Sequence, residues 1–148
     1  MTKGRWKITK KNSVIIIIIF ILCFSITGCR NRDNVIKPIN AEYFTISYGN
    51  SGYEAKDKVK QETVDFFVED YNNIKLNGTT NQEINFDKSI TIIFIDNDQI
   101  SAQLTIDDKG ICWIAANNEV NTYILDKKSN IYADLLKVYY EVKGKYKS

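Results

Sequence analysis

The chain has 148 residues, with 20 basic and 18 acidic side chains and no histidine. Without histidine, a Ser-His-Asp triad, a Cys-His pair and a zinc site with a His ligand are all excluded. No serine beyond residue 29 is followed three residues later by lysine, and the sequence has no Gly-rich phosphate loop. The composition therefore excludes several common forms of nucleophilic and metal-dependent catalysis.

A basic segment followed by an apolar segment opens the chain. Five basic residues lie before residue 12, and an apolar run of 13 residues, Val14–Ile26, follows them. A helix that spans a membrane needs roughly 20 apolar residues. We therefore interpret residues 1–28 as an export signal that is removed, rather than as a permanent membrane span.

The four residues that close this leader are Ile26-Thr27-Gly28-Cys29. They resemble the lipobox of bacterial lipoprotein precursors, in which the Cys receives a diacylglyceryl thioether before cleavage. The resemblance implies cleavage between Gly28 and Cys29, a lipid on Cys29, and anchoring to the outer face of the cell membrane. The abundance of Asn, Lys and Ile is typical of a low-GC Gram-positive bacterium, and the chain resembles small lipoproteins of such bacteria. The alternative is a secreted or uncleaved protein whose Cys29 carries no lipid.

Removal of the leader changes the charge and the cysteine content. Residues 29–148 hold 15 basic and 18 acidic side chains, so their formal charge is 15 − 18 = −3. This charge and the expected compartment both disfavour a nucleic-acid partner. Cys23 leaves with the leader and Cys29 carries the lipid, so Cys112 would have no partner for a disulfide. Because Cys112 lies in an apolar strand, we expect a buried and unreactive thiol.

A short tether and a single domain follow the leader. The polar composition of residues 29–40 predicts the tether, and residues 41–148 are long enough for one core. The alternation in Glu42–Tyr48 predicts a first strand. Apolar residues three and four positions apart then predict an amphipathic helix over Ala55–Leu76, with Gly78 in the left-handed conformation that ends a helix.

The second half of the chain predicts an antiparallel meander and a final helix. The helix begins after Ser129 or Asn130, which are suited to cap it. The whole order is β-α-β-β-β-β-α, an α+β fold with about five strands, a long helix after the first strand and a C-terminal helix. The four strands of the meander are predicted at Ser89–Asp96, Gln99–Asp107, Ile111–Ala116 and Asn121–Leu125.

Tight turns join the strands of the meander. Asn97-Asp98 predicts a two-residue hairpin turn, because both residue types tolerate positive φ. Asp107-Asp108 is interpreted as turn-forming, and Gly110 completes a three-residue loop. In the strand between these turns, apolar and polar residues alternate, which predicts one buried and one wet face. The apolar positions expected to point inward are Ile100, Ala102, Leu104 and Ile106.

Acidic residues give no recognisable metal or cofactor site. Asp96-Asn97-Asp98 is like the start of a calcium loop, but Ile100 and Ser101 stand where an oxygen ligand and Gly are needed. Glu62, Asp65 and Glu69 recur at helical spacing and are interpreted as a solvated helix face. We therefore expect no cofactor and no enzymatic activity. A carboxylate-based envelope hydrolase is kept as an alternative, because spacing alone does not exclude a carboxylate pair.

Aromatic residues are the remaining candidates for a binding surface. Tyr43, Trp113 and Tyr123 lie in predicted strands, and exposed Tyr and Trp favour recognition surfaces, although the same residues also complete cores. The sequence favours a lipid-anchored, non-catalytic module that binds a protein or peptide at the cell envelope. A narrower alternative is an immunity or inhibitor lipoprotein that intercepts a toxic peptide or an envelope enzyme.

Overall fold

The computed structural model describes residues 36–116 and 119–146. The predicted signal peptide, Gly28, Cys29 and the first part of the tether lie outside these residues. The chain divides into residues 1–33 and 34–148, and the second unit is the one described below. Within the described ranges, no helix is long and apolar enough to cross a membrane.

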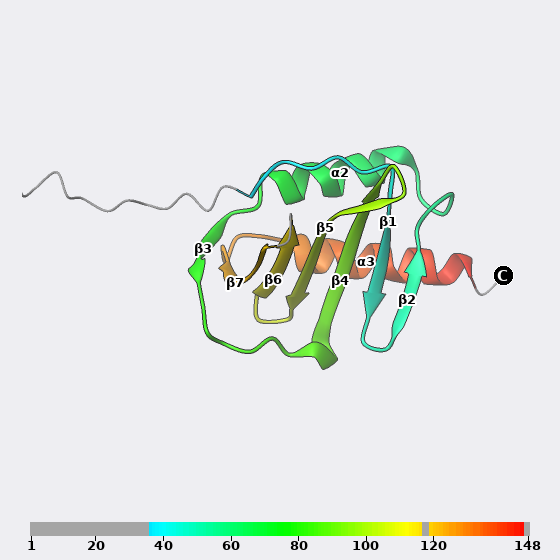
Figure 1. The fold of residues 1–148 in the computed structure, drawn as a ribbon. Coiled ribbons are helices and arrows are strands. Elements are labelled where there is room, and N and C mark those ends of the chain that lie inside the picture. The colour runs from blue at the N-terminus through cyan, green and yellow to red at the C-terminus, as the bar shows by residue number, and fades with distance from the viewer. Residues whose placement is uncertain (1–35, 117–118, 147–148) are drawn as a thin grey trace, which may run out of the picture. The chain divides into compact units, whose positions relative to one another are not determined.

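One antiparallel sheet organises the described residues, and its seven strands follow the spatial order β2-β1-β4-β5-β6-β7-β3 (Figure 1). This arrangement confirms the predicted α+β fold, with a helix after the early strands and a second helix at the C-terminus. The strands are β1 Tyr43–Tyr48, β2 Ser51–Glu54, β3 Leu76–Thr79, β4 Ser89–Asp96, β5 Gln99–Asp107, β6 Ile111–Ala116 and β7 Glu119–Leu125.

Two helices pack on the same face of the sheet. They are α2, Gln61–Asn72, and α3, Ile131–Lys145, and a short 3₁₀ turn, η1, spans Phe86–Lys88. The ring of Phe67 on α2 lies 5.8 Å from that of Phe44, and Tyr139 on α3 lies 5.7 Å from Tyr48. Phe44 and Tyr48 project from the same side of β1, because side chains alternate along a strand. In Figure 1, α3 passes behind the sheet.

The hydrophobic core lies between this face and the helices. Register places Phe44 opposite Phe94, and Ile92 opposite Leu104, so that matched rows of apolar side chains cross the strands. Each fully buried side chain of this size contributes roughly 1.5–3 kcal/mol. The helices complete the core with apolar stripes, of which the fully or almost fully buried members are Val64, Phe67, Tyr71, Ile131, Leu135, Val138, Tyr139 and Val142.

Helix α2 is shorter at both ends than the sequence predicts. Residues 51–54 pair with β1 as an extra edge strand, and the Ala55 amide donates to the Phe44 carbonyl at 2.9 Å. The helix therefore begins at Gln61. It ends at Asn72, because Leu76–Thr79 pairs with β7 as the other edge strand. Gly78, with φ of +102°, lies in that strand and does not end the helix.

The meander contains the predicted turns and one irregularity. Asn97 and Asp98 have φ of 49° and 58°, and Gly110 has φ of 80°, which confirms the turn assignments. Phe94 pairs with Ala102, but the next residue, Ile95, pairs with Ile100, because β5 has one extra residue at this bulge. The prediction that Ile100 points into the core is wrong, because this bulge leaves it 68% exposed.

The last part of the predicted tether packs against the domain. Ile39 is only 7% exposed. Its amide donates to Asn72 Oδ1 at 2.8 Å, and Asn72 Nδ2 donates to the Ile39 carbonyl at 3.0 Å. We call this reciprocal pair the Ile39–Asn72 clamp. The Ser101 hydroxyl also donates to the Asn40 carbonyl at 2.9 Å. The packed domain therefore starts before residue 41, the boundary expected from the sequence.

A buried carboxylate organises the turn between β5 and β6. Asp107 Oδ1 accepts the amides of Lys109 and Ile111, both at 2.9 Å, and Oδ2 accepts the Asn85 amide at 3.1 Å. These bonds satisfy the buried carboxylate and fix the loop before η1 against the strand end. The turn interpretation of Asp107-Asp108 is confirmed.

Candidate functional site

The face of the sheet opposite the helices is the first candidate surface, and we call it the open face. Register pairs place its side chains together, as in Thr45 with Ile93 and Gln103 with Ala115. Its members on the five central strands are uncharged: Tyr43, Thr45, Ser47, Thr91, Ile93, Ile95, Ile100, Gln103, Thr105, Trp113, Ala115, Val120, Thr122 and Ile124. Asp107, on the same side of β5, is charged but buried beneath the loop before η1.

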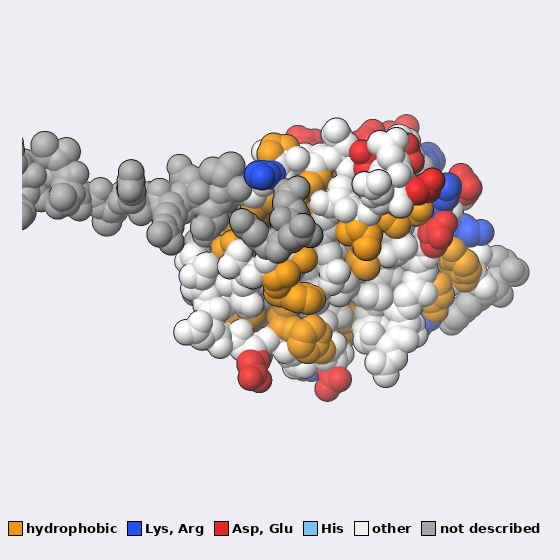
Figure 2. Space-filling model, in the orientation of Figure 1, with side chains coloured by type: hydrophobic (Ala, Val, Ile, Leu, Met, Phe, Trp, Pro, Cys, Tyr) orange, Lys and Arg blue, Asp and Glu red, His pale blue; other side chains and the backbone are white. Residues whose placement is uncertain are grey.

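Apolar side chains form a patch on the open face. Ile93, Ile95, Trp113 and Ile124 are partly exposed there, and Phe86 of η1 is 65% exposed. Figure 2 shows apolar side chains running down the middle of this face toward its lower margin. On β5 this face carries the polar residues Gln103 and Thr105, as the alternation predicts, whereas neighbouring strands add aliphatic side chains and no exposed charge.

Hydroxyl and amide groups accompany the patch. The Thr91 and Thr105 hydroxyls lie 2.9 Å apart across β4 and β5, within hydrogen-bonding distance. Gln103 Nε2 donates to the Thr105 hydroxyl at 3.4 Å. The first bond crosses from β4 to β5 and the second runs along β5, and both hold neighbouring side chains in fixed positions. The open face therefore presents ordered polar groups beside apolar ones.

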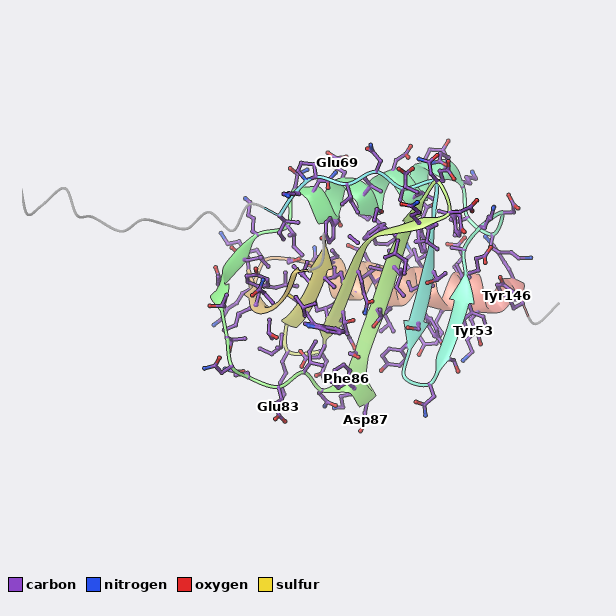
Figure 3. The ribbon with its side chains drawn as sticks, in the orientation of Figure 1. Tyr53, Glu69, Glu83, Phe86, Asp87 and Tyr146 are labelled. Carbon is purple, nitrogen blue, oxygen red and sulfur yellow. The ribbon has the colours of Figure 1, made fainter. Side chains whose placement is uncertain are left out.

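A hollow of about 310 Å³ lies at the end of the open face next to η1. We call it the η1 hollow. Figure 3 shows Phe86 and Asp87 at this margin, with Glu83 beside them. The hollow offers an aromatic ring, a carboxylate, an amide and several hydroxyls, and its lining residues are Ser47, Gly49, Asn50, Phe86, Asp87, Ser89 and Thr91.

The three aromatic residues singled out in the sequence lie on two different faces. Tyr43 and Trp113 belong to the open face, and the Lys56 ammonium lies 4.8 Å from the centre of the Tyr43 ring. Tyr123 is 9% exposed and pairs with Cys112 on the helix-covered face, so it is not part of the open face. Sequence reasoning missed Phe86, because it lies in a polar loop with no strand or helix pattern.

Cys112 is a free, buried cysteine in β6, as expected. Burial raises the pKa of its thiol to about 12, a hydrogen bond with the Tyr123 backbone partly offsets this rise, and the charge of Asp107 adds to it. The thiolate is the reactive form of cysteine. The Cys112 thiol is therefore protonated and unreactive at neutral pH.

A second concave surface lies between the two helices. This cleft of about 450 Å³ is lined by three carboxylates, Asp70, Asp126 and Asp134, together with Lys75 and Lys128. Burial raises the pKa of Asp70, and the negative charges of Asp134 and Glu69 raise it further. The sequence pattern did not bring Asp70 and Asp134 together, because they lie on helices far apart in the chain. Phe66 is one of the apolar residues whose spacing predicts the helix over Ala55–Leu76 and its buried stripe, but it is half-exposed at this cleft.

The remaining acidic residues do not add a metal centre. Glu62, Asp65 and Glu69 are exposed on the outer side of α2, as their spacing predicts. Among residues 36–116 and 119–146, no three acidic or cysteine side chains are arranged to hold a metal ion.

Comparison with protein-family models, with curated proteins and with solved structures finds no match for this chain.

Proposed function

We propose that this chain is a lipid-anchored, non-catalytic module that binds a protein or peptide across its open face at the outer surface of the cell membrane. The observation that carries the proposal is the patch of Ile93, Ile95, Trp113 and Ile124 on a sheet face that no helix covers within the described residues. Exposed apolar patches with polar surroundings are typical of interaction sites. Covering such a patch is favourable by about 25 cal/mol for each Å² of apolar surface.

The chemistry of the open face supports recognition rather than catalysis. A hydroxyl and an amide that are partly exposed on this face, those of Thr91 and Gln103, can position a bound segment by hydrogen bonds. General acid–base chemistry needs a titratable group in contact with the reacting atoms. The central strands present no exposed charged side chain on this face, so binding is the activity that its composition favours.

The membrane anchor is proposed from the lipobox-like segment that ends at Cys29. Two acyl chains hold a protein at a membrane far more firmly than one. We expect the intact mass of the wild type to begin at Cys29 and to include diacylglycerol, with retention in the membrane fraction. The Cys29→Ala variant is expected to lose the diacylglycerol and the retention in the membrane fraction. An unmodified or uncleaved wild-type chain would contradict the proposed anchor.

The binding activity is tested by recovering partners from detergent-solubilised cell envelopes. The bait is the full chain, compared with an Ile93→Asp/Trp113→Ser variant of the open face. Lys137→Gln, an exposed change on α3, is the matched control. We expect the wild type and the control to recover the same protein or peptide and the open-face variant to lose it. Repeated failure of the wild type to recover any partner would count against the proposal.

A second candidate function is favoured by the cleft between α2 and α3. Asp70 and Asp134 line one concavity, and a raised pKa at Asp70 is the kind of shift that a general acid requires. A carboxylate-based hydrolase of envelope polymers is therefore the alternative. It predicts release of soluble fragments from purified cell wall by the wild type and not by Asp134→Asn. Equal release by both proteins, or none by either, would eliminate it.

A further inference from the structure

The charge of the domain is uneven and mostly negative. Residues 36–146 contain 12 lysines, no arginine and 17 acidic residues, which gives 12 − 17 = −5. At the η1 end of the open face, Glu83, Asp87 and Asp108 outnumber Lys88 and Lys109. The Lys88 ammonium lies 3.4 Å from Asp108 Oδ2, so its charge is already partnered. Glu83 and Asp87 form no ion pair within the described part of the chain.

Figure 2 shows how these charges meet the apolar patch. Acidic side chains stand at the lower margin, and no Lys side chain lies over the apolar side chains in the middle of this view. Figure 3 shows Phe86 near Glu83 and Asp87 at the lower margin of the sheet. An aromatic face next to a carboxylate is a favourable environment for an ammonium or guanidinium group.

The opposite end of the open face is also acidic, which argues against self-association. The turn after β4 carries Asp96 and Asp98, and Glu42 precedes β1 at the same end, so three carboxylates outnumber Lys56, whose ammonium lies over the Tyr43 ring. Two copies stacked face to face would therefore bring carboxylates together whether their strands ran in the same or in opposite directions. Like charges brought together across an interface disfavour binding. An anionic lipid surface would be repelled for the same reason.

From these observations we propose that the open face binds a cationic, amphipathic peptide segment. Its aliphatic side chains lie on the patch around Ile93 and Trp113, and a Lys or Arg enters the η1 hollow beside Phe86 and Asp87. Side chains on one side of an extended segment are about 6.6–6.8 Å apart, the repeat of two strand residues. The proposal deepens the proposed function, since it uses the same face, but it does not require the lipid on Cys29.

The experiment compares three labelled synthetic ten-residue peptides by fluorescence anisotropy. One alternates Lys with Ile, one alternates Glu with Ile, and one alternates Lys with Ser. The full chain is held in nanodiscs of zwitterionic phospholipid, and empty nanodiscs measure binding to the lipid itself. We expect only the Lys/Ile peptide to bind above that background, with an affinity that falls as salt is raised from 50 to 300 mM.

Substitutions then locate the bound cation. Asp87→Asn is expected to weaken binding of the Lys/Ile peptide about three-fold, and Asp87→Lys about ten-fold, as for an exposed ion pair. Asp65→Asn, on the outer side of α2, is the matched control and should leave the affinity unchanged. Phe86→Ala should also weaken binding, and because Phe86 is 65% exposed this variant is expected to stay folded.

The outcomes distinguish this inference from the proposed function. Equal binding of the Lys/Ile and Glu/Ile peptides, or equal effects of Asp87→Asn and Asp65→Asn, would overturn the inference. If the Glu/Ile peptide alone bound and Trp113→Ser abolished its binding, the open face would still be a binding surface, but not for cations. If no peptide bound, the inference would fail, while recovery of a partner from envelopes would still decide the proposed function.

Discussion

The two faces of the sheet are built from the same strands but differ in how deeply their apolar side chains are buried. On the covered face, Ile92 and Leu104 are fully buried against the helices. On the open face, Ile93 follows Ile92 in β4, and Trp113 pairs with Thr105, which follows Leu104 in β5, yet both keep part of their surface exposed. Both faces hold residues of high strand propensity. The covered face therefore stabilises the fold, whereas apolar side chains on the open face are available to bind a partner.

The largest expected effect compares these faces directly. Leu104→Ala removes a fully buried side chain and leaves a cavity, so we expect the free energy of unfolding to fall by about 3–4 kcal/mol. Ile93→Ala removes a side chain that water already reaches in part, and we expect a loss of about 1 kcal/mol. Urea unfolding of both variants measures the difference. Equal losses would show that the open face is covered in the free protein.

A smaller effect is expected at Asp107, the buried charge on the side of the open face. Asp107→Asn keeps one carbonyl oxygen but weakens the bonds from three backbone amides. We expect the free energy of unfolding to fall by about 2 kcal/mol. Asp108→Asn is the control, because it removes only the partly exposed pair with Lys88 and should cost at most about 0.5 kcal/mol. A similar loss in both variants would mean that the Asp107 bonds do not hold the turn.

On the covered face, Tyr71 has a buried hydroxyl whose effect on stability can be measured. Its hydroxyl is buried and makes no hydrogen bond within the described residues, and its ring packs 5.4 Å from that of Phe94. Burial and, to a smaller extent, the interaction with Tyr123 raise the pKa of this hydroxyl to about 12. Tyr71→Phe should be neutral or stabilise the protein by up to about 1 kcal/mol, because no bond is lost.

The matched control for this prediction is Tyr132→Phe, measured by thermal unfolding. Tyr132 donates to the Lys88 carbonyl at 3.0 Å, so its hydroxyl has a partner. We expect this change to destabilise the protein by about 0.5–1 kcal/mol. If Tyr71→Phe were the more destabilising of the two, the Tyr71 hydroxyl would have a partner in solution.

The smallest effect concerns Asp70 in the helix layer. Its pKa is raised in the folded state, so the folded protein binds a proton more readily than the unfolded chain. Stability from this group is therefore present at acid pH and is lost as pH rises through the folded pKa. Asp70→Asn should raise Tm at pH 7, and the gain should shrink as pH approaches about 4, near the ordinary pKa of Asp. A gain in Tm that is the same at every pH in Asp70→Asn would contradict the raised pKa of Asp70.

The central strands were predictable because their local signals agree with one another. Strands β4, β5 and β6 begin and end at the predicted residues, since Asn97-Asp98 and Gly110 supply the positive φ that their turns need. The edge strands β2 and β3 were not predictable. Each has four residues, and the sequence Ser51-Gly52-Tyr53-Glu54 pairs only because β1 is beside it.

The candidate site was only partly predictable, for a related reason. Ile93 and Ile95 alternate with Phe94 in the predicted strand Ser89–Asp96, which alone places them on the side opposite Phe94, and they lie there in the structure. A strand with apolar residues on both sides does not show which side the helices cover, so exposure required the tertiary structure. The η1 hollow and the helix cleft join residues that are distant in the chain, and Asp87 and Asp134 carry no local signal of their surroundings.

The Ile39–Asn72 clamp has a mechanical consequence. A force that pulls the chain from the N-terminal side of residue 36 reaches the clamp before it reaches β1, and its two hydrogen bonds pass the load to the end of α2. Strand β1 lies between β2 and β4, so its extraction requires two ladders to break together. The clamp can therefore yield first under tension, and the open face keeps its shape while the few residues before β1 lengthen.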